Sequence, residues 1–87
     1  MTQLIDFYAD WCGPCKIMEP VLEQLEKEYT GKLEFKRVDV EAEGGMASEF
    51  GIFSIPTFVI LKDGKEVDRK EGAMPKEILR GWINSHL

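Results

Sequence analysis

The feature that most constrains this chain is a pair of cysteines three positions apart, Cys12 and Cys15, the only cysteines in its 87 residues. The apolar run that precedes them, over residues 4–9, predicts a buried strand. Apolar side chains then recur at the spacing of an amphipathic helix: Met18, Val21, Leu22, Leu25 and Tyr29. The pair therefore falls where a strand passes into the first turn of a helix.

A helix N-terminus changes the chemistry of a thiol placed there. Its free backbone N–H groups and the positive end of the helix dipole favour an anion. We therefore expect the thiolate of Cys12, at the mouth of the helix, to be stabilised and nucleophilic near neutral pH. Cys15 lies one turn further along the same side. Gly13 permits the local adjustment that a bridge between the two sulfurs needs, and Pro14 stiffens the first turn.

Three other interpretations of the pair are weaker. A zinc site needs four ligands, and the only other soft ligand is His86, next to the end of the sequence. A purely structural disulfide that closes so short a loop would remove little entropy from the unfolded chain. A pair of inert core thiols is disfavoured by the adjoining Gly-Pro turn. The spacing favours a redox-active pair.

The residues around the pair resemble the active-site segment of the thioredoxin family. They read Asp6-Phe7-Tyr8-Ala9-Asp10-Trp11-Cys12-Gly13-Pro14-Cys15-Lys16, a far more specific match than the cysteine spacing alone. The resemblance implies a thiol–disulfide oxidoreductase in which Cys12 attacks a substrate disulfide and Cys15 resolves the mixed disulfide. It also implies that Asp6 lies buried beneath the pair and exchanges a proton with Cys15. The alternative for Asp6 is a partly solvated or capping residue at a strand end.

A second segment, Ser54-Ile55-Pro56-Thr57, is similar to the cis-proline element of the same family. The resemblance implies a cis bond before Pro56, a loop that faces the cysteines, and backbone pairing of Ile55 with an extended substrate. Phe53 is more apolar than we expect at its position, so it belongs either to the core or to a wider apolar docking patch.

Further substrate-binding residues are implied by the resemblance: Trp11, Gly13 and Pro14 beside the thiols, and Gly72 beside the substrate groove. Gly72 is equally compatible with a plain glycine at a strand end. Arg37 stands where thioredoxins often carry a lysine close to the buried Asp. Because an arginine does not give up its proton, the partner of Asp6 in a proton relay is left open.

The order of elements along the chain predicts an α/β fold of the form β-α-β-α-β-β-α, a single domain over residues 1–87. The resemblance implies a reduced thioredoxin fold, with a four-stranded mixed sheet flanked by helices. The usual N-terminal strand and helix of the family are missing, so one outer edge of the sheet is expected to be unprotected. The polar strand over residues 66–71 belongs at a sheet edge. The last helix is expected to bury Ile78, Leu79, Trp82 and Ile83.

Charge and hydropathy exclude several classes of function. The net charge of −5 argues against nucleic-acid binding, which needs a basic face. No apolar run approaches the roughly 20 residues of a membrane span. The sequence begins directly in a strand, without a leader pattern, so we expect a cytoplasmic location, where a cysteine pair is more often catalytic than structural. No metal, nucleotide or flavin site is visible, and no cofactor is expected.

These features predict a monomeric reductant of protein disulfides that is recharged by an electron donor similar to thioredoxin reductase. The Gly-Pro dipeptide between the cysteines carries no cation that would over-stabilise the thiolate. Two alternatives remain. One is a glutaredoxin-like enzyme that uses glutathione, and the other is a binding module whose affinity for a partner depends on the redox state of the pair.

Overall fold

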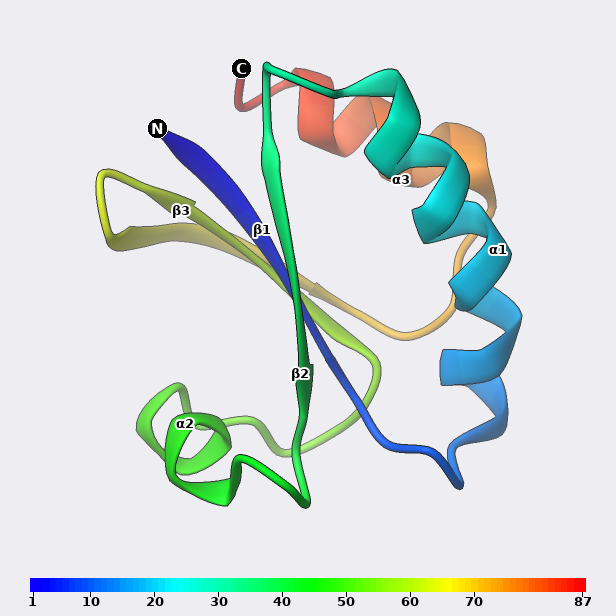
Figure 1. Cartoon of the computed structure of the whole chain (residues 1–87), viewed down its shortest axis with the longest axis vertical. Coiled ribbons are helices and arrows are strands. Elements are labelled where there is room, and N and C mark those ends of the chain that lie inside the picture. The colour runs from blue at the N-terminus through cyan, green and yellow to red at the C-terminus, as the bar shows by residue number, and fades with distance from the viewer.

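The computed structural model describes residues 1–87 and contains the predicted order of strands and helices. The elements are β1 (Thr2–Tyr8), α1 (Gly13–Glu28), β2 (Glu34–Asp39), α2 (Gly44–Glu49), β3 (Thr57–Lys62), β4 (Lys65–Glu71) and α3 (Lys76–Asn84). Figure 1 shows α1 and α3 side by side over one face of the sheet, with α2 on the other side. The predicted α/β architecture is confirmed.

The four strands form one mixed sheet in the order β2-β1-β3-β4. β1 is parallel to β2 and antiparallel to β3, and β3 pairs antiparallel with β4. β4 lies at one edge, as its polar sequence predicted, and β2 lies at the other. Lys, Asp and Glu side chains along β4 discourage pairing with another strand there.

Each face of the sheet carries its own apolar cluster, because side chains along a strand alternate between the faces. Leu4 of β1 packs with Phe58 and Ile60 of β3 against α1 and α3. Its neighbour Ile5 belongs to the cluster on the opposite face, which α2 covers. Asp6 shares the face of Leu4 by this alternation, which places its carboxyl group on the side of the sheet that α1 covers.

One prediction about the core is wrong. Leu79, Trp82 and Ile83 of α3 are buried, but Ile78 is 54% exposed. Successive residues of a helix are rotated by about 100°, so Ile78 lies beside the stripe formed by the other three and points to solvent. No helix in the structure is long and apolar enough to cross a membrane.

Candidate active site

Cys12 is the N-cap residue of α1, with extended backbone angles (φ −84°, ψ 112°), and its Sγ accepts a hydrogen bond of 3.2 Å from the backbone N–H of Cys15. The two cysteines form a disulfide, with their Cα atoms 5.2 Å apart. Both are buried in a small cluster with Ala9. The strand therefore delivers one sulfur to the helix N-terminus, and the first turn of the helix delivers the other.

A loop from a distant part of the chain faces this pair. The Ile55–Pro56 peptide bond is cis, as predicted, and the carbonyl oxygen of Ile55 lies 3.8 Å from Sγ of Cys12. The backbone N–H of Gly72 donates a hydrogen bond of 2.8 Å to the carbonyl of Pro56. Gly72 has a φ of +88°, a conformation that favours glycine. β4 thus ends against the proline loop, which it holds beside the cysteines.

Asp6 is a buried carboxylic acid in the middle of β1, so the alternative of a solvated strand end is wrong. Its Oδ2 accepts a hydrogen bond of 3.3 Å from Nε of Arg37, while its Oδ1 is buried without any partner. Burial raises the pKa of Asp6 to about 6, and the charge and hydrogen bond of Arg37 oppose this rise. The group can therefore exchange a proton close to neutral pH.

Arg37 faces Asp6 across the parallel pair of β1 and β2, where the two residues are in register. Its guanidinium carbon lies 4.5 Å from the centroid of the Tyr8 ring, and its Nη2 lies 3.8 Å from a carboxylate oxygen of Glu19 on α1. An aromatic face and a second carboxylate thus hold the cation in place. The predicted proximity of Arg37 to Asp6 is confirmed.

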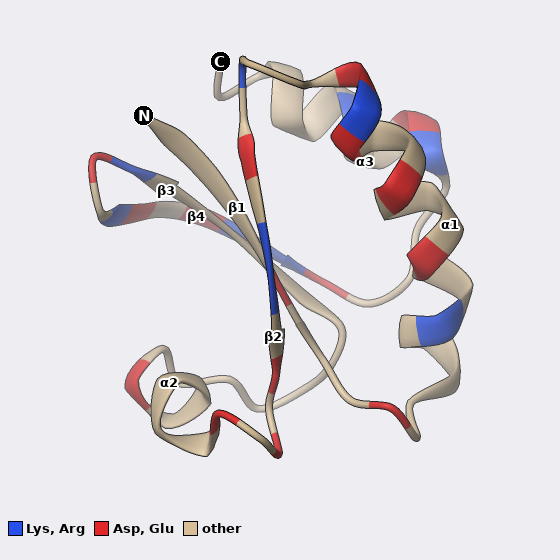
Figure 2. Ribbon diagram, viewed as in Figure 1, with Lys and Arg blue, Asp and Glu red and all other residues tan.

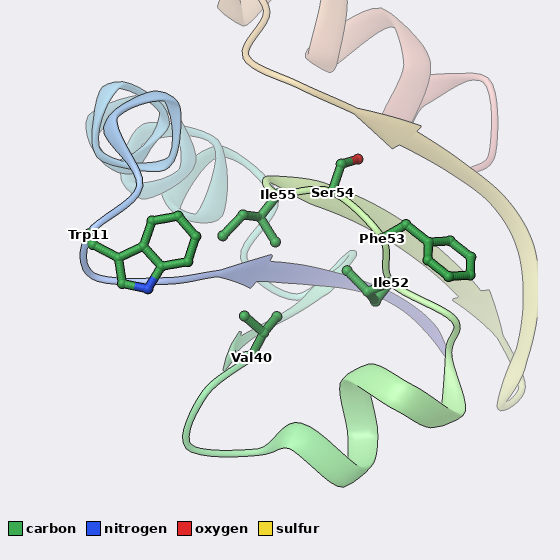
Figure 3. Close-up of a pocket in the computed structure, with 6 residues that line it drawn as sticks. All are labelled: Trp11, Val40, Ile52, Phe53, Ser54 and Ile55. Carbon is green, nitrogen blue, oxygen red and sulfur yellow. The ribbon is translucent and has the colours of Figure 1, made fainter.

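An apolar hollow of about 170 Å³ lies next to the proline loop. Its lining residues, drawn in Figure 3, are Trp11, Val40, Ile52, Phe53, Ser54 and Ile55. Val40 and Ile52 were not predicted from the sequence, and Ser54 was identified only as part of the proline motif. The position of Ile52 just before that motif was a usable signal, whereas Val40 reaches the hollow only through the pairing of β2 with β1.

Two exposed aromatic residues stand at opposite ends of the hollow, with Ile55 between them (Figure 3). Trp11 is 68% exposed, and its Nε1 donates a hydrogen bond of 2.5 Å to Glu41. Phe53 is 97% exposed. Of its two predicted roles, membership of the core is therefore wrong, and its ring widens the apolar surface.

His86, the remaining soft ligand, lies away from the cysteines. It contacts Asp68 of β4 at 2.9 Å and packs edge-on against Trp82. The C-terminus lies at the opposite end of the molecule from the start of α1 (Figure 1). No group of three or more His, Cys, Asp or Glu side chains is arranged to hold a metal ion.

Comparison with known proteins decides the family. The thioredoxin family model matches residues 1–85. The thioredoxin of Staphylococcus aureus is 45% identical over 86 residues, which cover 99% of this chain and 83% of that protein. The chain belongs to the thioredoxin family.

Solved thioredoxin structures agree with this membership. The X-ray structure of Fasciola hepatica thioredoxin is 43% identical, with a TM-score of 0.92, and the match covers 99% of this chain and 81% of that one. A mutant thioredoxin from Halobacterium salinarum is 37% identical, with a TM-score of 0.90, over 97% of this chain and 73% of that one. The thioredoxin fold predicted from the sequence is confirmed. The protein is a thiol–disulfide oxidoreductase, and its Cys12–Cys15 disulfide occupies the position that this exchange chemistry requires.

Proposed function

We propose that this thioredoxin reduces protein disulfides, with Cys12 as the attacking thiol and Cys15 as the resolving thiol. The observation that carries this division of roles is the position of Cys12 at the N-cap of α1, with its Sγ beside the carbonyl of Ile55. The helix N-terminus stabilises a thiolate at Cys12. Cys15 lies within the first turn of the helix, where it is in reach of Cys12.

The reaction then runs in two exchanges. The Cys12 thiolate attacks one sulfur of the client disulfide, and the other client sulfur leaves as a thiolate that takes up a proton. Cys15 loses its proton and attacks Sγ of Cys12, which releases the second client thiolate and forms the Cys12–Cys15 disulfide. Two electrons pass to the client, and the pair is oxidised.

Asp6 is the proton acceptor for Cys15 in this proposal. Its carboxyl group is buried on the face of the sheet covered by α1, and one of its oxygens has no hydrogen-bond partner. Tyr8, on the same face by strand alternation, packs against the cluster that contains Cys15. A pKa of about 6 suits a group that takes up and returns a proton near neutral pH. Arg37 orients the carboxylate but keeps its own proton.

The client segment docks around the cysteines in an extended form. Trp11, Gly13 and Pro14 are exposed beside the disulfide and form one side of the substrate groove. Gly72 and the cis-proline loop form the other side, where backbone groups of Ile55 next to Pro56 pair with the client.

The direction of the reaction and its setting are part of the proposal. With Gly13-Pro14 between the cysteines, no cation over-stabilises the thiolate, so the pair acts as a reductant. Residues 1–87 act as one domain and as a monomer in the reducing cytoplasm, where a thioredoxin-reductase-like donor reduces the pair again.

The redox midpoint of the pair tests the direction. Thiol trapping across a buffered dithiol/disulfide series should give a value near the roughly −270 mV known for thioredoxin itself. A value near −120 mV, typical of a periplasmic oxidant, would overturn both direction and compartment. Turnover with glutathione and no reductase would instead favour the glutaredoxin-like alternative.

Two cysteine variants test the division of roles. Cys15→Ser should accumulate a mixed disulfide with a client through Cys12, visible as a mass adduct, whereas Cys12→Ser should form none. The opposite pattern would exchange the roles. Partner binding and biological function that survive both substitutions together would favour the binding module.

A further inference from the structure

The largest exposed aromatic surface on the molecule borders the apolar hollow. Phe53 is almost completely solvent-exposed, and Trp11 is two-thirds exposed at the other end of the same hollow. Isolated exposed apolar residues are common, but two exposed aromatic rings around one apolar depression form a patch that favours binding. The patch lies beside Cys12, since Ile55 both lines the hollow and contacts Sγ of Cys12.

Two carboxylates are hydrogen-bonded to lining residues of this patch. Glu41 accepts the hydrogen bond from Nε1 of Trp11, and Glu71 accepts one of 2.9 Å from Oγ of Ser54. Neither of these two carboxylates takes part in an ion pair within the chain. The two hydrogen bonds come from uncharged donors, so each carboxylate keeps its negative charge.

The surrounding surface adds to this negative potential. Residues 38–61 contain four acidic residues and no Lys or Arg, and Figure 2 shows only acidic colouring from the end of β2 through α2. Two cations of β4 lie near Glu71. Lys70 precedes it in the strand, and Arg69, which also interacts with the charge of Glu71, binds the carbonyls of Phe50 and Gly51 and is paired with Glu66. The hollow is therefore apolar, and two of its lining residues, Trp11 and Ser54, are bonded to carboxylates.

We propose that this hollow selects client disulfides in which the cysteine is flanked by a large apolar side chain and by a Lys or Arg. The apolar side chain packs into the hollow against Phe53, and the cation lies against Glu41 or Glu71. Phe53 is then a specificity-determining residue. The inference rests on the proposed reduction of protein disulfides and adds the chemical class of the preferred client.

Charge complementarity favours this occupant over an uncharged or acidic one. An acidic client would meet the like charges of these carboxylates, and its approach would be slowed. A basic residue satisfies a carboxylate that has no cationic partner in the free protein. Its contribution should depend on ionic strength, because the two carboxylates are exposed.

Four synthetic peptides test the proposal. Each carries one cysteine in a disulfide with the same small chromophoric thiol, and the flanking residues combine Phe or Ala with Lys or Glu. The rate of chromophore release by the reduced protein is measured at low and high salt. The Phe-Lys peptide should react fastest. Exchange of Lys for Glu should slow reduction by about tenfold at low salt and much less at high salt.

Variants assign the preference to the named residues. Phe53→Ala should remove most of the ratio between Phe and Ala peptides, a ratio that we expect to be about tenfold in the unchanged protein. Glu41→Gln and Glu71→Gln keep the hydrogen bonds from Trp11 and Ser54, and each should lower the ratio between Lys and Glu peptides by about threefold. Ratios of rates within one variant cancel any change in general activity.

Matched controls lie on the helices. Ile78→Ala truncates another exposed apolar side chain, and Glu23→Gln neutralises an exposed carboxylate of α1. Both should leave the four rates unchanged. Equal reduction of all four peptides by the unchanged protein would overturn the inference while leaving the proposed function intact. Failure to release chromophore from any peptide would overturn the proposed function, and the selectivity with it.

Discussion

Asp6 of β1 and Asp68 of β4 are two aspartates of the same sheet that differ in burial and in the number of their hydrogen-bond partners. Asp6 is buried, has Arg37 as its only hydrogen-bond donor, and leaves Oδ1 without a partner. Asp68 of β4 is partly exposed and accepts hydrogen bonds from Nε1 of Trp82 at 2.8 Å and from its neighbour's backbone N–H, and it contacts Nε2 of His86 at 2.9 Å.

The fold shifts the pKa values of these two carboxyl groups in opposite directions. Burial raises the pKa of Asp6 to about 6, whereas the hydrogen bonds from Trp82 and His86 lower the pKa of Asp68. The carboxylate of Asp68, which ties α3 to the sheet, has several hydrogen-bond partners, whereas the buried carboxylate of Asp6 leaves one oxygen without a partner. The comparison indicates that the buried acid of β1 costs stability near neutral pH, whereas the acid at the C-terminal corner adds to it.

The largest effect should come from Asp6→Asn. Because its pKa is raised, Asp6 supports folding fully below pH 3.8 and progressively less as the pH rises to about 6. At pH 7 the variant should therefore be more stable than the unchanged protein by about 3 kcal/mol, and at pH 3.5 the difference should vanish. Urea unfolding at both pH values measures this. The same stability difference at pH 7 and at pH 3.5 would contradict this prediction. In the same variant, the rate of client reduction should fall about tenfold or more, because the proposed proton acceptor of Cys15 is lost.

Asp68→Ala should have the opposite sign. Loss of the carboxylate leaves Nε1 of the buried Trp82 without its acceptor, which should cost about 2 kcal/mol at pH 7. Since the pKa of Asp68 is lowered, this support is present above pH 3.8 and is lost as the pH falls below it. Thermal unfolding at pH 7 checks the loss. An unchanged melting temperature would mean that Asp68 does not stabilise the fold. Reduced activity on small disulfides would mean that Asp68, like Asp6, affects the redox pair.

Arg37→Gln sharpens the comparison by removing the one donor to Asp6. The pKa of Asp6 should rise above 6, because Arg37 now lowers it. The pH dependence of client reduction should move upward with it. Stability should change by less than about 1 kcal/mol, since the arginine side chain is 38% exposed. Arg37→Lys keeps the charge and serves as the control. An identical pH profile in the unchanged protein, Arg37→Gln and Arg37→Lys would mean that Arg37 does not influence the pKa of Asp6.

His86→Ala should give the smallest effect. The ring contacts Asp68 and the edge of Trp82, but Asp68 keeps its other two donors when the ring is removed. We expect a loss of about 0.5 kcal/mol in thermal or urea unfolding. A loss as large as that of Asp68→Ala would mean that the histidine, and not the indole, carries the attachment of α3 to β4.

Much of the site was predictable because its signals are local in sequence. The cysteine pair, the preceding strand and the proline motif lie in short segments, and strand alternation placed Asp6 on the face of Leu4. The proximity of Arg37 to Asp6 followed from the resemblance. The same local reasoning gave the order of helices and strands.

The missed features depend on which segments meet in space. Val40 and Ile52 line the hollow only because β2 and the proline loop converge on Trp11. Glu41 follows β2 and Glu71 ends β4, and no periodicity predicts that they accept hydrogen bonds from Trp11 and Ser54. Ile78 was wrongly predicted to be buried, because the prediction followed its apolar character and not its angular position on α3.

The central place of β1 has a consequence during translation. Leu4 pairs with Phe35 on one side and with Ile60 on the other, so the first strand lacks its second neighbour until roughly fifty more residues have been made. At about 5–20 residues per second, that interval lasts roughly 3–10 seconds. The two thiols are synthesised early in it, and the loop that faces them is synthesised late. In a nascent chain Cys12 and Cys15 are therefore present before the proline loop exists, and the contact of Ile55 with Cys12 forms only when β3 joins the sheet.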